Sequence, residues 1–167
     1  TVTNPTNTTP NLLGTYPSLA SALTGLNAVT AMTGPVTLTM DAGTSETAPA
    51  TGLVIGSASL NAVLSATNTV TINKTGGTVT LNAGVGTATP TSASPDGILK
   101  FAGADWVTLD GLTLTDGNTT NPATMEVGIG MYKLSATDGC NNNTIQNCII
   151  NVQRVNNASG SGPIVEG

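Results

Sequence analysis

Threonine and apolar residues alternate along much of this chain. In ADWVTLDGLTLTD, residues 104–116, apolar side chains alternate with threonines on both sides of Asp110-Gly111. The same pattern recurs in PVTLTM (35–40), NTVTIN (68–73) and GTVTLN (77–82). A period of two residues is typical of a strand with one buried face. The chain is therefore expected to consist mainly of short strands, with apolar residues inside and threonines outside.

A helical period occurs once, near the N-terminus. Leu19, Ala22, Leu23 and Leu26 follow one another at i, i+3, i+4 and i+7, which predicts an amphipathic helix over residues 17–27. Residues 1–14 show no period and contain two prolines, so we expect them to form an extended tail or linker.

Short threonine–apolar pairs recur at an almost constant spacing. Thr71-Ile72, Thr108-Leu109 and Thr144-Ile145 are separated by 37 and then by 36 residues. Each pair lies between two further short apolar segments. This spacing predicts units of about 35 residues with three strands each, which stack as parallel ladders in register. About three units fit the chain, and Ile164-Val165 lies where a fourth unit would continue the pattern.

The bends between the strands favour corners over hairpins. Asp110-Gly111 joins two strands with no polar loop between them, whereas a hairpin needs a loop whose strands pair with each other. Alternation inside a strand is equally typical of a hairpin sandwich, so the prediction depends on the spacing of the units.

Several segments resemble right-handed parallel β-helix proteins of the pectin-lyase-like class. GTYPSLASALTGLN followed by GPVTLTMDAGTSET is similar to their N-terminal cap and first coil, and FAGADWVTLDGLTLTD and DGCNNNTIQNCIINV are similar to internal coils. The resemblance covers residues 14–167. It implies an all-β fold, a right-handed parallel β-helix (solenoid) with a short N-terminal capping helix. Residues 15–167 would form its capped N-terminal part, which we expect to continue beyond residue 167.

Composition indicates where such a protein works. Only 8% of the residues are charged, against about 25% in ordinary soluble domains, while the chain holds 31 threonines and 17 asparagines. This style is similar to long secreted or surface proteins of gliding and environmental Bacteroidota, which are commonly exported by the type 9 secretion system. The C-terminal sorting domain of those proteins is absent from this sequence. The composition predicts a secreted or cell-surface location.

Charge excludes some partners. The net charge is −5, histidine is absent, and the four cations, Lys74, Lys100, Lys133 and Arg154, are scattered. No basic patch is present to bind nucleic acid. No apolar run approaches the ~20 residues that span a bilayer, so we expect no membrane insertion. Glycans and proteins of the surface or of the secretion machinery are the expected partners.

The acidic residues form no recognisable catalytic group. General acid–base chemistry needs two positioned titratable groups, and Asp110 and Asp116, which are close in sequence, both lie in Asp-Gly turns. Two cysteines without histidine are too few ligands for zinc. We therefore predict no catalytic residue, no metal site and no cofactor, and we favour a non-enzyme. The acids are Asp41, Glu46, Asp96, Asp105, Asp110, Asp116, Glu126, Asp138 and Glu166.

A few residues remain as candidates for a site. Thr108, Thr113 and Thr115 form the candidate polar binding face. Cys140 and Cys148 either form a disulfide, or Cys148 is a plain inward residue that matches Leu112.

Two further features have interpretations that stay open or are structural. Trp106 either points outward, where it can stack on sugars, or packs over a corner. The asparagines at 141–143 and 147 are expected at a corner, where asparagine tolerates a left-handed backbone.

The expected function is that of a structural stalk or adhesin segment. Two further functions stay open. One is that of a carbohydrate-active enzyme, lyase-like or hydrolase-like, with its site in downstream coils. The other is that of an ice-binding or glycan-binding face of stacked threonines.

Overall fold

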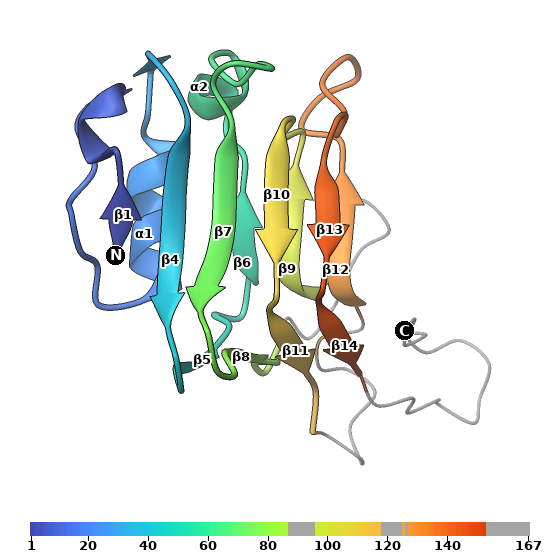
Figure 1. Cartoon of the computed structure of the whole chain (residues 1–167). Coiled ribbons are helices and arrows are strands. Elements are labelled where there is room, and N and C mark those ends of the chain that lie inside the picture. The colour runs from blue at the N-terminus through green and yellow to red at the C-terminus, as the bar shows by residue number, and fades with distance from the viewer. Residues whose placement is uncertain (87–95, 118–124, 126, 153–167) are drawn as a thin grey trace.

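The computed structural model describes residues 1–86, 96–117, 125 and 127–152. Within these residues the backbone forms short strands in four sheets, two α-helices and one 3-10 helix. Within each of the three larger sheets the strands lie side by side in chain order, from the N-terminal end to the C-terminal end, but neighbours in a sheet are not consecutive in the chain (Figure 1).

The helices are the 3-10 helix Pro5–Asn7, α1 (Leu19–Asn27) and α2 (Ala58–Asn61). The strands are β1 (Val2–Thr3), β2 (Thr8–Thr9), β3 (Ala31–Met32), β4 (Val36–Asp41), β5 (Ser45–Thr47), β6 (Leu53–Ile55), β7 (Val70–Thr75), β8 (Thr80–Asn82), β9 (Gly97–Ala102), β10 (Val107–Asp110), β11 (Thr113–Thr115), β12 (Val127–Tyr132), β13 (Thr144–Gln146) and β14 (Ile149–Asn151).

Three sheets contain the strands from β4 onward. The first has the order β1-β4-β7-β10-β13, the second β14-β11-β8-β5, and the third β12-β9-β6. Every pair within them is parallel except β1 with β4. We call these sheets A, C and D. Successive sets of strands are called units: unit 1 is β4–β6, unit 2 is β7–β9, unit 3 is β10–β12, and unit 4 is β13 with β14.

The register between units agrees with the sequence spacing. Thr71 pairs with Thr108, and Thr108 pairs with Thr144. Ile72, Leu109 and Ile145 are aligned in the same way one residue further along. The predicted repeat spacing is thus confirmed as strand register, and each unit adds one strand to each sheet it reaches.

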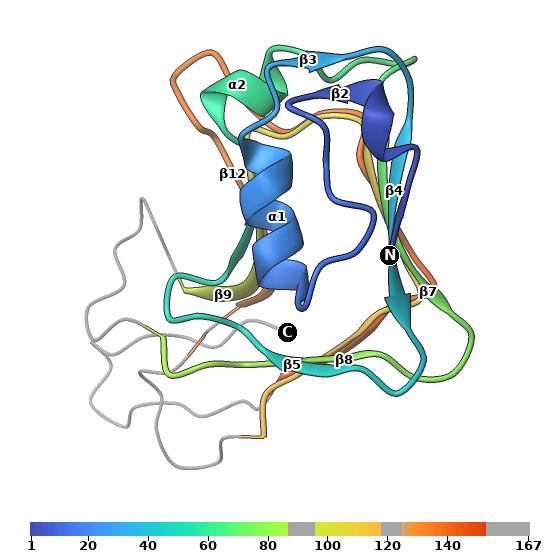
Figure 2. The same cartoon turned by 90° about the vertical axis from the view of Figure 1, so that its left-hand side faces the viewer.

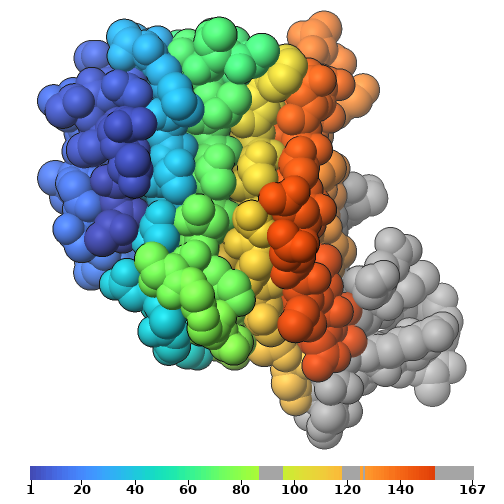
Figure 3. All heavy atoms as spheres, viewed as in Figure 1, coloured from blue at the N-terminus to red at the C-terminus, as the bar shows by residue number. Residues whose placement is uncertain are grey.

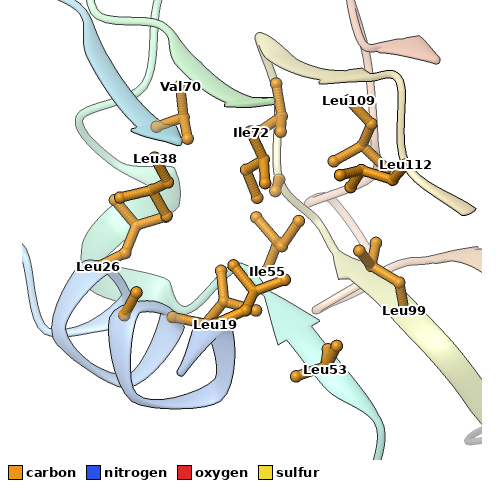
Figure 4. Close-up of a cluster of buried hydrophobic side chains, with 14 of the residues drawn as sticks. Leu19, Leu26, Leu38, Leu53, Ile55, Val70, Ile72, Leu99, Leu109 and Leu112 are labelled. Atoms are coloured by element: carbon orange, nitrogen blue, oxygen red, sulfur yellow. The ribbon is translucent and has the colours of Figure 1, made fainter. Parts of the chain in front are cut away.

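The core consists of inward rows, each contributed by equivalent positions of successive units. Leu38, Ile72 and Leu109 form one such row, and they are 2%, 0% and 0% exposed. A second row runs through Leu81 and Leu114 in sheet C, and a third through Ile55 and Phe101 in sheet D. Figure 4 shows several of these side chains converging from different strands. Alternation buries them because successive side chains point to opposite faces of a strand.

The predicted helix is confirmed as α1, which lies across the N-terminal end of the three sheets (Figure 2). Leu19, Ala22, Leu23 and Leu26 are its buried residues, the four that the helical period indicated. Ser18 is the N-cap, and its side chain accepts a hydrogen bond from the Ser21 N–H in a capping box. The helix therefore begins two residues later than predicted.

Glu46 fixes the start of α1 against β5. It pairs with Leu81 in the strand register, so it occupies a position that is apolar in the following units. Its two carboxylate oxygens accept hydrogen bonds from the backbone N–H groups of Leu19 (2.7 Å) and Ala20 (2.8 Å). These groups belong to the first helical turn, whose N–H groups have no partner within the helix and which favours negative charge.

Replacing Glu46 by alanine should lower the free energy of unfolding by about 1–3 kcal/mol, because two N–H groups lose a charged acceptor. Glu46→Gln keeps a side-chain oxygen and should lose less. Thr47→Ala changes an exposed neighbour and serves as control. Urea unfolding of the three variants measures the difference, and equal midpoints for Glu46→Ala and Thr47→Ala would contradict this role.

The first residues pair with the rest of the chain, although we expected residues 1–14 to be an extended tail or linker. β1 runs antiparallel to β4, with Val2 opposite Leu38, and β2 runs antiparallel to β3. Leu12 is 5% exposed and belongs to the core. Two-residue strands leave no period in the sequence, which is why the pattern did not reveal them.

The predicted fold class, an all-β right-handed parallel β-helix, is wrong. The structure is mixed: two α-helices accompany the sheets, sheet A contains an antiparallel edge strand, and β2 with β3 forms a wholly antiparallel sheet. Within the described residues each sheet is open, with two edge strands, and none closes on another. The repeat pattern predicts the parallel ladders correctly. It does not predict α2 or the antiparallel strands β1, β2 and β3, whose sequences show no period.

Candidate functional site

A row of threonines runs along the outer face of sheet A. Thr37, Thr71, Thr108 and Thr144 are paired in register, and Thr3 of β1 extends the row by one strand. Neighbouring strands lie about 4.8 Å apart, so the hydroxyl groups repeat at roughly that distance. We call these five residues the threonine row. Thr108 of the candidate face is its fourth member.

Thr113 and Thr115 lie on another sheet. Both belong to β11 of sheet C, and the left-handed Gly111 (φ 77°) turns the chain between β10 and β11. The three predicted residues therefore share a unit but are divided between two faces. Thr113 is aligned with Thr80, and Thr115 with Asn82.

Asp110 joins units 3 and 4 at the corner between sheets A and C. Its carboxylate accepts hydrogen bonds from Asn147 Nδ2 (2.8 Å) and Gln146 Nε2 (3.0 Å). These bonds, that from Asn147 first, hold the pKa of the Asp110 carboxyl below its ordinary value of 3.8, with a smaller contribution from Lys74 against an opposing effect of burial. Asp110 therefore lies in a turn, as expected, and also connects unit 3 to unit 4 through these two hydrogen bonds.

The lowered pKa predicts a pH dependence of stability. A carboxyl that is more acidic in the folded protein stabilises the fold above the unfolded-state pKa, and this contribution is lost as pH falls through the folded-state value. The stability advantage of the wild type over Asp110→Asn should therefore be constant near neutral pH and shrink below about pH 4.

Urea unfolding between neutral pH and about pH 3 measures this advantage. Asn147→Gly is the matched variant, because it removes the stronger donor and suits the left-handed backbone at this position (φ 54°). It should reduce the pH dependence without removing Asp110. An advantage that is the same at pH 3 and pH 7 would contradict the assignment.

The asparagines lie at corners, as predicted. Asn142 and Asn147 have left-handed backbones with φ 56° and 54°. Asn143 bridges units 3 and 4: its Nδ2 donates to the Ala104 carbonyl (2.7 Å) and its Oδ1 accepts from the Val107 N–H (2.9 Å). These asparagines satisfy backbone groups where the strands end.

The cysteines are both free thiols in the structure and are half-buried. Cys140 Sγ donates to the carbonyl oxygens of Tyr132 (3.4 Å) and Phe101 (3.8 Å), and burial raises the pKa of its thiol. Cys148 precedes Ile149, which pairs with Thr113, so Cys148 occupies the position of Leu112. It packs against the core, as expected of a plain inward residue.

Two free thiols predict a simple labelling result. Iodoacetamide added to denatured protein without reductant should attach to both cysteines, and the intact mass should rise by two carbamidomethyl groups. The same protein treated first with reductant is the control and should give the same mass. Labelling that appears only after reduction would show that the two cysteines are bonded.

Trp106 lies at the corner that precedes β10. It is aligned with Asn142 and shares its left-handed backbone, with φ 57°, although such a conformation costs a bulky residue about 1–2 kcal/mol. Its N–H donates to the Asn141 carbonyl and its carbonyl accepts from the Val70 N–H, each at 3.2 Å. The side chain is half-buried. The backbone of Trp106 thus connects three units at this corner.

Among the described residues three charged side chains are buried, which sequence reasoning missed. Lys100 is 9% exposed, Asp96 2% and Asp116 4%, and neither carboxylate is without a partner. The alkyl chain of Lys100 lies over Gly52 and Gly97, where added Cβ atoms would come within 3.2 Å of it. The apolar setting of Lys100 in GILKFA was the only sequence signal for its burial.

Two cavities lie next to α1. One of about 120 Å³ lies between β1, β4 and the start of α1; its lining includes Asp41 and Glu46, and Glu46 is bound by the helix. A larger one of about 540 Å³ lies between α1 and residues 49–54, and its lining contains no titratable side chain among the described residues. The part of the chain that the structure describes contains no group of three metal-binding side chains.

Some sequence predictions fall outside the described residues. They concern Glu126, Arg154, Glu166 and Ile164-Val165. Among the helices that the structure does describe, none is long and apolar enough to cross a membrane.

Comparison with protein-family models, with curated proteins and with solved structures finds no match to this chain.

Proposed function

We propose that this protein is a structural segment of an exported protein, secreted or held at the cell surface, where it acts as a stalk or adhesin element. The observation that carries the proposal is the neutral outer surface of sheet C. Every outward position of sheet C is uncharged: Ser45, Thr80, Thr113 and Ile149 form one row, and Thr47, Asn82, Thr115 and Asn151 form the other.

The way the units are joined supports a mechanical role. Each unit pairs with the next through backbone ladders, and side chains such as Asp110 and Asn143 add bonds between units at the corners. Each added unit lengthens the parallel ladders by about 4.8 Å, so the length of the stack increases with the number of units.

Location is the part of the proposal that one experiment tests directly. An antibody against residues 1–152 should label intact cells of the source organism, and brief protease treatment of those cells should remove the signal. An antibody against a cytoplasmic protein is the control and should label only after lysis. If the signal requires lysis and survives protease treatment, the exported location is wrong.

Glycan binding is a second candidate function, which the threonine row favours. Hydroxyl groups in register over five strands can donate and accept hydrogen bonds along an extended sugar chain. A glycan array probed with the wild type and with a Thr71→Val/Thr108→Val variant tests this. Thr80→Val/Thr113→Val on sheet C is the matched control. If the Thr71→Val/Thr108→Val variant binds the same glycans as the wild type, the threonine row is not the glycan-binding surface.

The described residues give less support to ice binding and to catalysis. The second outward row of sheet A is mixed, with Thr39, Asn73, Asp110 and Gln146 in successive units. A flat two-row threonine array of the kind that ice binding favours is therefore not formed on this sheet. A carbohydrate-active enzyme would need titratable groups in a cleft. The larger cavity is lined by neutral residues, and of the two acids that line the smaller one, Glu46 is bound by α1.

A further inference from the structure

The C-terminal end of the stack exposes apolar residues whose row partners in the preceding unit are buried. Ile145 is 39% exposed, whereas its row partner Leu109 is 0% exposed. Ile150 is 44% exposed against 0% for Leu114. In sheet D, Met131 is 47% exposed against 0% for Phe101. All three inward rows thus end in an exposed side chain. We call Ile145, Ile150 and Met131, with the outer edges of β12, β13 and β14, the end face.

Among the described residues, no strand pairs with the outer backbone edges of the end face. In this part of the chain β13, β14 and β12 are the last strands of sheets A, C and D. Their sequences, TIQ, IIN and VGIGMY, contain no charged residue and no proline. Natural proteins usually protect such edges with lysine, proline or a covering segment, because a free edge pairs readily with another strand. Because β12, β13 and β14 lack these protective residues, their edges are suited to pair with a further strand.

At the opposite end of the stack, the first strand of each sheet contacts β1 or α1. β1 covers the edge of β4 in sheet A. Glu46 of sheet C is bound by the start of α1. In sheet D, Asn27 Nδ2 donates to the Val54 carbonyl, and the Gly56 N–H donates to Asn27 Oδ1, both at 2.9 Å. Figure 2 shows α1 across this end, and Figure 3 shows the N-terminal and C-terminal strands at opposite ends of the stack. A second copy that continued the stack with this end would therefore bring β1 and α1 against the end face.

We infer that the end face is a docking surface for a further three-strand polypeptide unit of the same threonine–apolar pattern, which adds one parallel strand to each of β12, β13 and β14. We identify this occupant because the end face continues the interfaces by which the units of this chain already pair with each other. Units 1 to 4 join by parallel pairing in one register. Apolar residues fill most inward positions, and the outward positions of sheet C are neutral. The inference holds whether or not the protein is exported.

A peptide of residues 97–115 is a suitable probe because its strands, β9, β10 and β11, already pair with β12, β13 and β14 on their other side. Fluorescence anisotropy with the labelled peptide and the full chain should show saturable binding, and a scrambled peptide should not bind. The double variant Ile145→Lys/Ile150→Lys should bind at least about tenfold more weakly. Ala31→Lys, which adds a charge at an exposed position of β3, should bind as the wild type does.

Hydrogen exchange and sedimentation make the test independent of how well the lysine variant folds. On the wild-type chain the peptide should slow exchange of the β13 and β14 amides and leave β1 unchanged. Absence of binding, protection elsewhere, or equal binding by the lysine variant with its fold intact would overturn the inference. If the wild type sediments as a dimer that the lysine substitutions dissociate, the occupant is a second copy, and the inference is also wrong.

Discussion

Gly56→Ala is expected to destabilise the protein by about 2–6 kcal/mol. Gly56 follows β6 and has φ 121°, a conformation that L-residues rarely adopt, and the resulting strain costs about 1–3 kcal/mol. A Cβ there would also collide with the carbonyl oxygen of Ala102 and lie 2.9 Å from its carbonyl carbon. Because both contacts are with backbone of the next unit, the sheet must shift, which adds about 1–3 kcal/mol.

Gly76→Ala is the matched control. Gly76 also has positive φ, 63°, but no atom lies within 4 Å of the place where its Cβ would be. It should therefore lose only the conformational term, about 1–2 kcal/mol. Urea unfolding gives both values. Equal losses at the two positions would mean that unit 2 does not approach Gly56 as the register requires.

Leu109→Ala should cost about 3–5 kcal/mol, the second large effect. Leu109 lies in β10, which has β7 on one side and β13 on the other, and it is 0% exposed. Its row partner Ile72 is equally buried, so removal of three carbons leaves a cavity that neighbours fixed in parallel ladders cannot fill. Thermal or urea unfolding measures the loss.

Two variants distinguish this effect from a general loss of side-chain contacts. Ile145→Ala removes a similar side chain from the same row at the end face, where 39% of it is exposed, and should cost clearly less. Thr108→Ala changes the adjacent outward position and should change stability by less than about 1 kcal/mol. If Ile145→Ala costs as much as Leu109→Ala, the end face is covered in the free protein.

The strand register was predictable because it follows directly from the spacing. Thr71, Thr108 and Thr144 pair where the count of residues places them, since one face of each strand is buried and a slip by one residue would expose it. The buried face of α1 was predictable for the same reason. In both cases the signal was a period of apolar residues.

Features that depend on single polar side chains were not predictable. Glu46 and Asn27 close the N-terminal end through bonds to backbone groups 26–29 residues away, and no period marks them. The prediction of an all-β parallel β-helix failed because α2 and the antiparallel strands β1, β2 and β3 are too short to leave a pattern. Thr108, Thr113 and Thr115 were expected on one face, since the direction of the bend at Gly111 is not encoded in the alternation.

The central claim is that consecutive units lie side by side in parallel register, and interstrand nuclear Overhauser effects test it most directly. Isotope-labelled protein should show contacts that connect Thr71 with Thr108 and Thr108 with Thr144, together with contacts between Leu81 and Leu114. Contacts that instead connect β7 with β8, or β10 with β11, as antiparallel partners would mean that the strands form hairpins. That result would contradict the stacked units and the end face derived from them.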